Sequence, residues 1–470
     1  MCEGIANELG GINLGDKRLN RRSCQVIEAL AANPQASING ACSGWADTIA
    51  AYRLLDNHKV TPERILQPHR EATLRRIREY PVVLIAQDTT ELDFSDHPPT
   101  DVRCLNRPTR FGLYHHVHLA ITPDKLPLGV VGTESFDRAP ETLGQANERE
   151  TLPIEQKESY RWLKGYRLAC QIAGECPGTQ IISVADREAD IYDIYVEAQE
   201  QHQRPTDSRA EYVIRVKAER STLERNPEAG PAAYHKVRER VGRSKLLKTL
   251  LVDLPATPKR TARKATLEVR AIQVTIKPPH ARSQLAPVTA NVVLMEEIGG
   301  PDDDTRVSWL LITTLPIATI ADVLHVVECY VARWGIEIYF RTLKSGCCVE
   351  DLQLQTKARL ENCLAFYNII AWRVVSLTYM NRTCPQLPCT AVFDAAEWKS
   401  VWCVVQRQPL PATPPTLSEF MKLLTELGGY NNRTTEPAAG PQSVWIGLRR
   451  TIDFAVAWLA FGPEQSRSCV

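Results

Sequence analysis

The stretch YVARWGIEIYFRTLK, residues 330–344, sets one carboxylate among cationic and aromatic side chains. At about 100° per residue, a continuous helix would bring six of these side chains to one face: Tyr330, Arg333, Trp334, Glu337, Arg341 and Lys344. One interpretation is a solvated helix face, because Glu337 and Arg341 stand four residues apart and can pair. The other is a face that binds a nucleic acid, on which cations hold phosphates, aromatic rings stack on bases and the acid binds a metal ion.

The metal interpretation requires further carboxylates, and two of them follow apolar runs that are typical of buried strands. Asp88 ends PVVLIAQD, residues 81–88, and Asp186 ends IISVAD, residues 181–186. The carboxyl ends of strands are where α/β sheets commonly bind ligands. Either aspartate could instead cap a turn or a helix. Together with Glu337 they form an oxygen-rich set suited to Mg²⁺ or Mn²⁺, and two such ions about 3.5–4 Å apart support phosphoryl transfer.

The order of the predicted elements indicates an α/β protein. Short helices fill the first eighty residues, and strands and amphipathic helices alternate from there to residue 204. Alternating strands at 205–305 suggest an inserted β-region. Its residues 236–270 hold eleven Lys and Arg against three acids, which favours contact with a polyanion over a plain solvated loop. Helical stretches resume after residue 362.

Composition limits the remaining classes of protein. The net charge is +1 over 470 residues, so binding to a polyanion depends on local patches. No run approaches 18 apolar residues and the first residues do not resemble a secretory signal, so we expect no membrane span and a cytoplasmic location. The fourteen cysteines contain no CxxC pair, which favours reduced thiols. The sequence also lacks the GxxxxGK[ST], HExxH and GxSxG motifs.

Three histidines close together raise the possibility of a zinc site. They are His115, His116 and His118. In a strand, alternation places only His116 and His118 on the same face. We therefore prefer packed or hydrogen-bonded histidines to a zinc site.

These motifs resemble the insertion-sequence-four family of DDE transposases. Tyr330, Arg333, Glu337 and Lys344 reproduce its Y-(2)-R-(3)-E-(6)-K signature, and DTT at 88–90 and DREADI at 186–191 occur in the family's order and approximate spacing. LGDKRLNRR at 14–22 and AYRLLDN at 51–57 are also similar to the family. The resemblance covers nearly the whole chain, and it is weakest in the inserted region and after residue 380.

The resemblance implies an α/β fold with a ribonuclease-H-like catalytic core, an inserted β-strand region and helical terminal domains. The expected parts are a DNA-end-binding domain at 1–66, the core at 67–204 and 306–362, the insertion at 205–305 and a dimerisation region at 363–470. The core would bind Mg²⁺, or Mn²⁺ in its place, as two ions on Asp88, Asp186 and Glu337. We expect a homodimer in a synaptic complex that is associated with the nucleoid when it is bound to DNA.

The implied activity is cut-and-paste transposition on double-stranded DNA. The steps are nicking of the transposon end, hairpin formation, hairpin opening and joining to target DNA. Tyr330, Arg333, Arg341 and Lys344 would contact phosphates, and a base would flip onto Trp309, although burial in a strand also explains that residue. The other expected DNA contacts are Trp334, Arg215, Lys217 and Arg53. Two alternatives stay open, a metal-dependent nuclease without strand transfer and a silent DNA-binding protein.

Overall fold

The computed structural model describes residues 5–144, 152–203, 208–230, 232–254, 260–303, 305–431 and 439–463. Its centre is one mixed sheet, in the order β3-β2-β1-β4-β5-β11-β10-β9-β6-β7, with β8 paired to β9. The strands are β1 (Val82–Asp93), β2 (Gly112–Ile121), β3 (Pro127–Phe136), β4 (Gln180–Ala185), β5 (Glu211–Arg215), β6 (Ser221–Arg225), β7 (Tyr234–Lys236), β8 (Leu246–Leu254), β9 (Arg263–Ile276), β10 (Val288–Ile298) and β11 (Ser308–Thr313).

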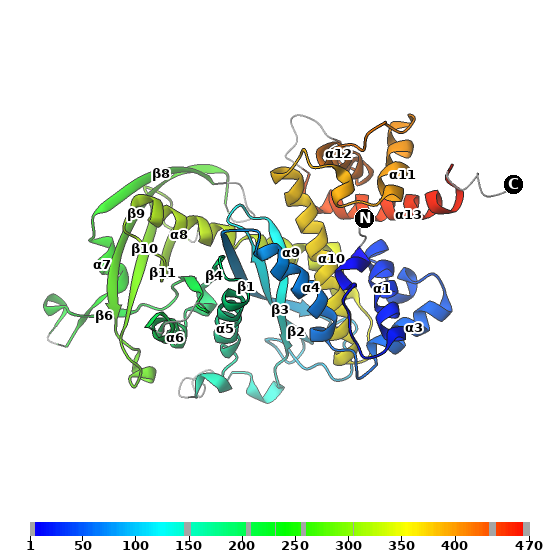
Figure 1. The fold of residues 1–470 in the computed structure, drawn as a ribbon. Helices are drawn as coiled ribbons and strands as arrows, with labels where there is room; N and C mark the ends of the chain where they lie inside the picture. The colour runs from blue at the N-terminus through cyan, green and yellow to red at the C-terminus, as the bar shows by residue number, and fades with distance from the viewer. Residues whose placement is uncertain are drawn as a thin grey trace.

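Helices surround this sheet and form both ends of the chain (Figure 1). They are α1 (Lys17–Ala32), α2 (Ile38–Ala41), α3 (Trp45–Leu55), α4 (Pro62–Ile77), α5 (Tyr160–Glu175), α6 (Tyr192–Gln203), α7 (Val237–Gly242), α8 (Ile320–Ala332), α9 (Gly335–Arg341), α10 (Lys357–Thr383), α11 (Ala395–Gln406), α12 (Leu417–Leu427) and α13 (Pro441–Phe461). Shorter helical turns include η1 (Ile5–Leu9), η4 (Arg187–Ala189) and the π-helical η7 (Thr342–Gly346).

The sheet is parallel only at its centre. β1 pairs in parallel with β4, and β4 with β5, whereas β1 to β3 form an antiparallel meander. Alternation along β1 divides its apolar side chains between two layers, because neighbouring residues of a strand face opposite sides. Val83 and Ile85 pack with α5 and α6, and Leu84 packs with α8. Helices on both faces of the sheet confirm the predicted α/β class.

The inserted strands extend the central sheet. β11 pairs antiparallel with β5, and β10 and β9 follow on the same sheet. The sequence grouped YVIRV with the insertion because it alternates as the inserted strands do. The structure instead places β5 beside β4 in the parallel centre, since Tyr212, Val213 and Ile214 are buried.

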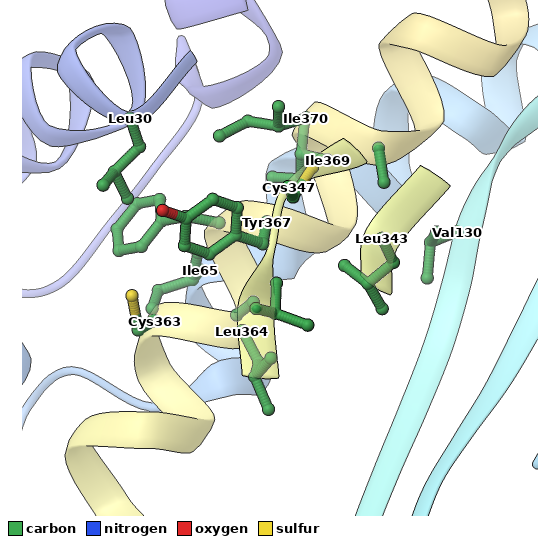
Figure 2. Packing of buried hydrophobic residues seen from close by; sticks show 14 of the residues in the cluster. Leu30, Ile65, Val130, Leu343, Cys347, Cys363, Leu364, Tyr367, Ile369 and Ile370 are labelled. Carbon is green, nitrogen blue, oxygen red and sulfur yellow. The ribbon is translucent and has the colours of Figure 1, made fainter. Parts of the chain in front are cut away.

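The N-terminal helices and the central sheet share one hydrophobic core. Leu30 of α1 and Ile65 of α4 pack toward α10 residues such as Leu364 and Tyr367, and Val130 of β3 lies in the same cluster (Figure 2). Asp16 caps α1 through the Arg18 N–H, and Thr61 caps α4 through the Arg64 N–H.

Helix α10 bears on the expectation that no segment of the chain is apolar enough to span a membrane. Its 27 residues are long and apolar enough to span a membrane, although no single run of the sequence suggested it. In the structure, 89% of its most apolar window is buried inside the protein. We therefore interpret α10 as the core helix that connects the N-terminal, central and C-terminal parts.

The expected continuous helix at 330–344 is interrupted. α8 ends at Ala332, α9 begins at Gly335, and the π-helical turn η7 begins at Thr342. Across the break the N–H groups of Trp334 and Ile336 bond to carbonyls three residues back, which rotates the chain relative to an ideal helix. The prediction that all six polar and aromatic side chains share one face is therefore only partly correct: Arg333 reaches Glu337, but Tyr330 and Arg333 are buried, while Trp334, Glu337 and Arg341 are exposed.

The C-terminal bundle predicts a sensitive glycine. Gly447 of α13 lies against the Leu424 carbonyl of α12, and a Cβ there would overlap that backbone atom. Gly447→Ala should lower the free energy of unfolding by about 2–3 kcal/mol, because neither helix can move without repacking. Urea denaturation measures this change, and Gly440→Ala, with open space around the added carbon, is the control. Equal stability of the two variants would contradict the packing described.

Candidate active site

Asp88 lies where the parallel part of β1 stops. The β1–β4 pairing ends at Gln87 and Ala185, but β1 continues to Asp93 as the partner of β2. The expectation that Asp88 ends its strand was therefore wrong, because the antiparallel hairpin carries the strand further. Its Oδ1 accepts a hydrogen bond from the Thr89 N–H at 2.8 Å. Oδ2 faces the helix break around Arg333.

Asp186 follows β4 directly, beside the point at which Asp88 leaves the parallel pairing. Its carboxylate accepts from the Glu188 N–H at 2.8 Å and so caps the short turn η4. The capping role that the sequence left open is thus present in the structure. It does not exclude a second role, because a carboxylate oxygen has further lone pairs.

Arg333 joins two of the three acids. Its Nη1 donates to Asp88 Oδ2 at 2.9 Å, and its Nη2 donates to Glu337 Oε1 at 2.7 Å. The arginine side chain is 7% exposed, that of Asp88 is 19% exposed and that of Glu337 is 48% exposed. Residues from a strand and from the interrupted helix, 245 positions apart, are therefore held together by one guanidinium group.

Electrostatic coupling brings Asp186 into the same group. Burial raises the pKa of Asp88 to about 6 despite the nearby Arg333, and the charges of Asp186 and Glu337 add to the increase. Burial acts to lower the pKa of Arg333, but the acids and Tyr330 outweigh it and leave the pKa raised. The three predicted acids are thus close enough to repel one another, which is the condition that a bound cation relieves.

The donor set fits a hard divalent cation, but the side chains are not yet arranged around one. Among the described residues, no three His, Cys, Asp or Glu side chains form a ready metal cluster. Carboxylate oxygens are the ligands that Mg²⁺ and Mn²⁺ prefer. Because Arg333 takes one oxygen of Asp88 and one of Glu337, its positive charge competes with a metal ion for these two acids.

An aromatic pair lies next to Arg333. Trp309 of β11 contacts Tyr330 of α8 edge-on, with ring centroids 5.3 Å apart. The Arg333 guanidinium lies 5.8 Å from the centre of the Tyr330 ring. Trp309 is half-buried and Tyr330 is 2% exposed. Trp309 thus combines a packed edge with accessible surface, whereas Tyr330 mainly supports it.

The rest of the signature segment lies around the acids with different exposure. Trp334, at the helix break, is 49% exposed, and Arg341 at the end of α9 is also exposed. Lys344 in the π-helical turn donates to the Glu91 carbonyl at 2.9 Å and pairs with Glu350 at 3.1 Å. Lys344 therefore fastens the turn to β1.

The other predicted DNA contacts lie on separate elements. Arg215 ends β5 and donates to the Ser308 carbonyl of β11 at 3.1 Å. Lys217 lies two residues beyond and is exposed. Arg53 is exposed on α3, in the N-terminal helical part. The structure brings Arg215 near the aromatic pair, while Arg53 belongs to a different part of the molecule.

The histidines occupy the two faces of β2 that alternation predicts. His115 contacts Ser135 and Asn368, whereas His116 and His118 are ring neighbours on the opposite face, 4.8 Å apart. Burial lowers the pKa of each, that of His115 and His118 to about 4. All three are buried polar residues of the core.

Sequence reasoning missed Arg161 of α5. Its Nε donates to Thr89 Oγ1 at 3.0 Å and its Nη2 donates to Glu188 Oε2 at 2.8 Å. The sequence offered no signal for it, because Arg161 lies in an ordinary amphipathic helix far along the chain from both partners.

The bridge of Arg333 leads to a prediction about metal binding by the protein alone. Arg333→Met should tighten Mn²⁺ binding about tenfold, because the ion no longer competes with charge-assisted hydrogen bonds to the two acids. Electron paramagnetic resonance of free Mn²⁺ measures the dissociation constant. Arg341→Met, an exposed change at the end of α9, is the control. Unchanged or weaker binding in Arg333→Met would show that Arg333 does not occupy the cation position.

Comparison with protein families adds three matches along the chain. Residues 1–60 match the model described as transposase DNA-binding, residues 184–372 match the transposase DDE domain, and residues 369–462 match the transposase Tn5 dimerisation domain. The DDE match includes Asp186 and Glu337 and begins after Asp88. It accords with the mixed sheet and supports the expected ribonuclease-H-like core. The chain belongs to the DDE transposases related to the Tn5 transposase and to the insertion-sequence-four family.

Proposed function

We propose that this DNA transposase excises and inserts its element by cut-and-paste phosphoryl transfer at Asp88, Asp186 and Glu337. The observation that carries the proposal is the convergence of these acids around Arg333 from β1, the end of β4 and α9. Family membership implies a divalent metal, and we propose two Mg²⁺ ions, with Mn²⁺ able to replace them. When bound, such ions activate the attacking oxygen and stabilise the leaving oxygen of a phosphodiester.

The chain's own residues would orient the DNA at these acids. Arg333 can exchange its two carboxylates for a phosphate, since a guanidinium matches both groups in geometry. Exposed Arg341 and Trp334 lie beside Glu337 and are suited to a phosphate and a base, respectively. Lys344 and Arg215 would need to leave their carbonyl partners or to share them with DNA.

The same acids would serve nicking, hairpin formation, hairpin opening and joining to target DNA, because each step transfers a phosphoryl group. A nuclease without strand transfer would use the same acids, and only a strand-transfer assay separates the two activities. We place the protein in the cytoplasm, on nucleoid DNA, since its proposed substrates are transposon ends and target DNA.

Loss of any one acid should abolish cleavage. Asp88→Asn, Asp186→Asn and Glu337→Gln should each slow nicking of the element's own end about 1,000-fold or more, because the phosphoryl transfer loses a charged ligand. Gel shifts in Ca²⁺ should show end binding that is close to that of the unaltered protein. Asp96→Asn, an exposed change near Asp88, is the control. A variant that still cleaves at the normal rate would remove its residue from the site.

Trp309 should matter for one step more than for the others. Its exposed surface next to Tyr330 is suited to stacking by a flipped base. Trp309→Ala should slow hairpin formation about 10- to 100-fold, with a smaller effect on the first nick, because base stacking contributes about 1–3 kcal/mol. Labelled-end assays resolve both products. Trp309→Phe should recover much of the loss, and equal slowing of nick and hairpin would argue against flipping.

The dimerisation match places self-association in the C-terminal part, and we propose the end of α13 as the contact surface. Val456, Leu459 and Phe461 expose 62%, 61% and 89% of their surface there. Such neighbouring apolar side chains favour burial against a second copy of the chain.

Charge in this surface should weaken the dimer. The double change Leu459→Asp and Phe461→Asp should raise the dimer dissociation constant at least about tenfold, since buried apolar anchors dominate interface energy. Analytical ultracentrifugation with end DNA measures it. Arg449→Asp, also exposed on α13, is the control. A dimer dissociation constant that the double change leaves unaltered would place the contact elsewhere.

A further inference from the structure

We propose that Arg161 is a positioning residue that sets the orientation of both aspartate carboxylates, Asp88 and Asp186, for metal binding. The inference rests on the proposed function of these two acids. It concerns how the side chains that follow two paired strands, nearly a hundred residues apart in the chain, are kept in a fixed orientation at the site.

Each carboxylate is held by the backbone of a neighbour. Asp88 accepts from the N–H of Thr89, and Asp186 accepts from the N–H of Glu188, both at 2.8 Å. The β1–β4 pairing, which ends at Gln87 and Ala185, fixes the spacing of the two backbones at this point. It does not fix how the two carboxylates are turned, because each accepts only a bond that is local to its own segment.

Arg161 makes this connection through the side chains of the same two neighbours. Nε donates to Thr89 Oγ1 at 3.0 Å and Nη2 donates to Glu188 Oε2 at 2.8 Å. One planar guanidinium therefore holds both residues whose N–H groups hold the carboxylates. The planar fork fixes two partners at once, which a flexible ammonium group cannot reproduce fully.

The guanidinium is itself fixed in place. Its third nitrogen, Nη1, donates to the Glu158 carbonyl at 2.8 Å, and the rings of Phe136 and Trp162 lie 5.3 and 5.4 Å from its central carbon. The side chain is only 10% exposed. Glu188 is 57% exposed, so its pairing with Arg161 contributes little energy by itself. The buried contacts of the arginine are what hold the guanidinium in a position that reaches both neighbours.

The hydrogen bond from Arg161 to Thr89 continues to a buried histidine of the core. Thr89 Oγ1 accepts from Arg161 and also shares a hydrogen bond with His116 Nδ1, 2.8 Å away. The chain Arg161, Thr89, His116 thus fixes the residue after Asp88 from two sides.

The test is direct Mn²⁺ titration of the full chain, followed by electron paramagnetic resonance. Arg161→Ala should weaken Mn²⁺ binding about 10- to 100-fold, the usual effect of removing groups that orient metal ligands. Arg161→Lys, which can keep one of the two hydrogen bonds, should have an intermediate Mn²⁺ affinity. Arg167→Ala is the matched control, since Arg167 lies on the same helix and pairs with Glu197, away from the acids. Its Mn²⁺ affinity should stay unchanged.

Melting temperature and end binding in Ca²⁺ separate positioning from folding. The Arg161→Ala variant should have the same melting temperature and the same end binding as the Arg167→Ala control. If Arg161→Ala does not fold, Thr89→Val and Glu188→Ala each remove one of the two side-chain hydrogen bonds to Arg161, and each should weaken Mn²⁺ binding about threefold, as parts of the same effect. The proposal would be overturned if Arg161→Ala bound Mn²⁺ as tightly as the control does. It would also be overturned if the variants at Thr89 and Glu188 both did so.

Asp88→Asn distinguishes this proposal from the function on which it rests. If Asp88→Asn weakens Mn²⁺ binding and Arg161→Ala does not, the metal site stands and the role of Arg161 is wrong. If Asp88→Asn binds Mn²⁺ as the unaltered protein does, the proposed site itself is wrong, and the role of Arg161 is lost with it.

Discussion

The contact on which the site depends is the bridge from Asp88 through Arg333 to Glu337. Two half-buried acids and the exposed Glu337 would repel one another without a cation among them, and the raised pKa of Asp88 reflects burial first and then that repulsion. In the protein alone, the arginine supplies the positive charge. The same guanidinium is suited to a phosphate, so the arrival of DNA offers it an alternative partner while the acids become available to metal.

The surrounding fold makes such an exchange possible because it holds the acids from three directions. β1 and β4 are adjacent strands of the sheet, and α9 contacts β1 after a break in the helix at Arg333 and Trp334. Gly335 at the start of α9 lies beside Ile121 of β2, whose Cδ1 would be 3.0 Å from an added Cβ. The long helix α10 then ties the catalytic part to the N-terminal helices through one shared core (Figure 2). The proposed end-binding and catalytic parts therefore share one hydrophobic core.

Much of this was predictable from the sequence, for identifiable reasons. Buried strands such as Ile181–Ala185 are short apolar runs, and the three acids stand out because each follows such a run or sits among cations. Long-range pairing was not predictable. Periodicity assumes an ideal helix. It could not show that backbone hydrogen bonds to carbonyls three residues back turn Arg333 inward toward Asp88. Local pattern likewise placed β5 in the insertion, and gave no indication of Arg161, whose partners come from two other segments.

The most direct measurement is anomalous X-ray diffraction at the manganese edge from crystals of the protein bound to its element's end. The account predicts manganese peaks within ligand distance of Asp88, Asp186 and Glu337, with the Arg333 guanidinium turned from the carboxylates to a DNA phosphate. The account would be contradicted by a complex that holds DNA at the site under saturating Mn²⁺ but shows no manganese peak beside these acids, with Arg333 still bridging Asp88 and Glu337.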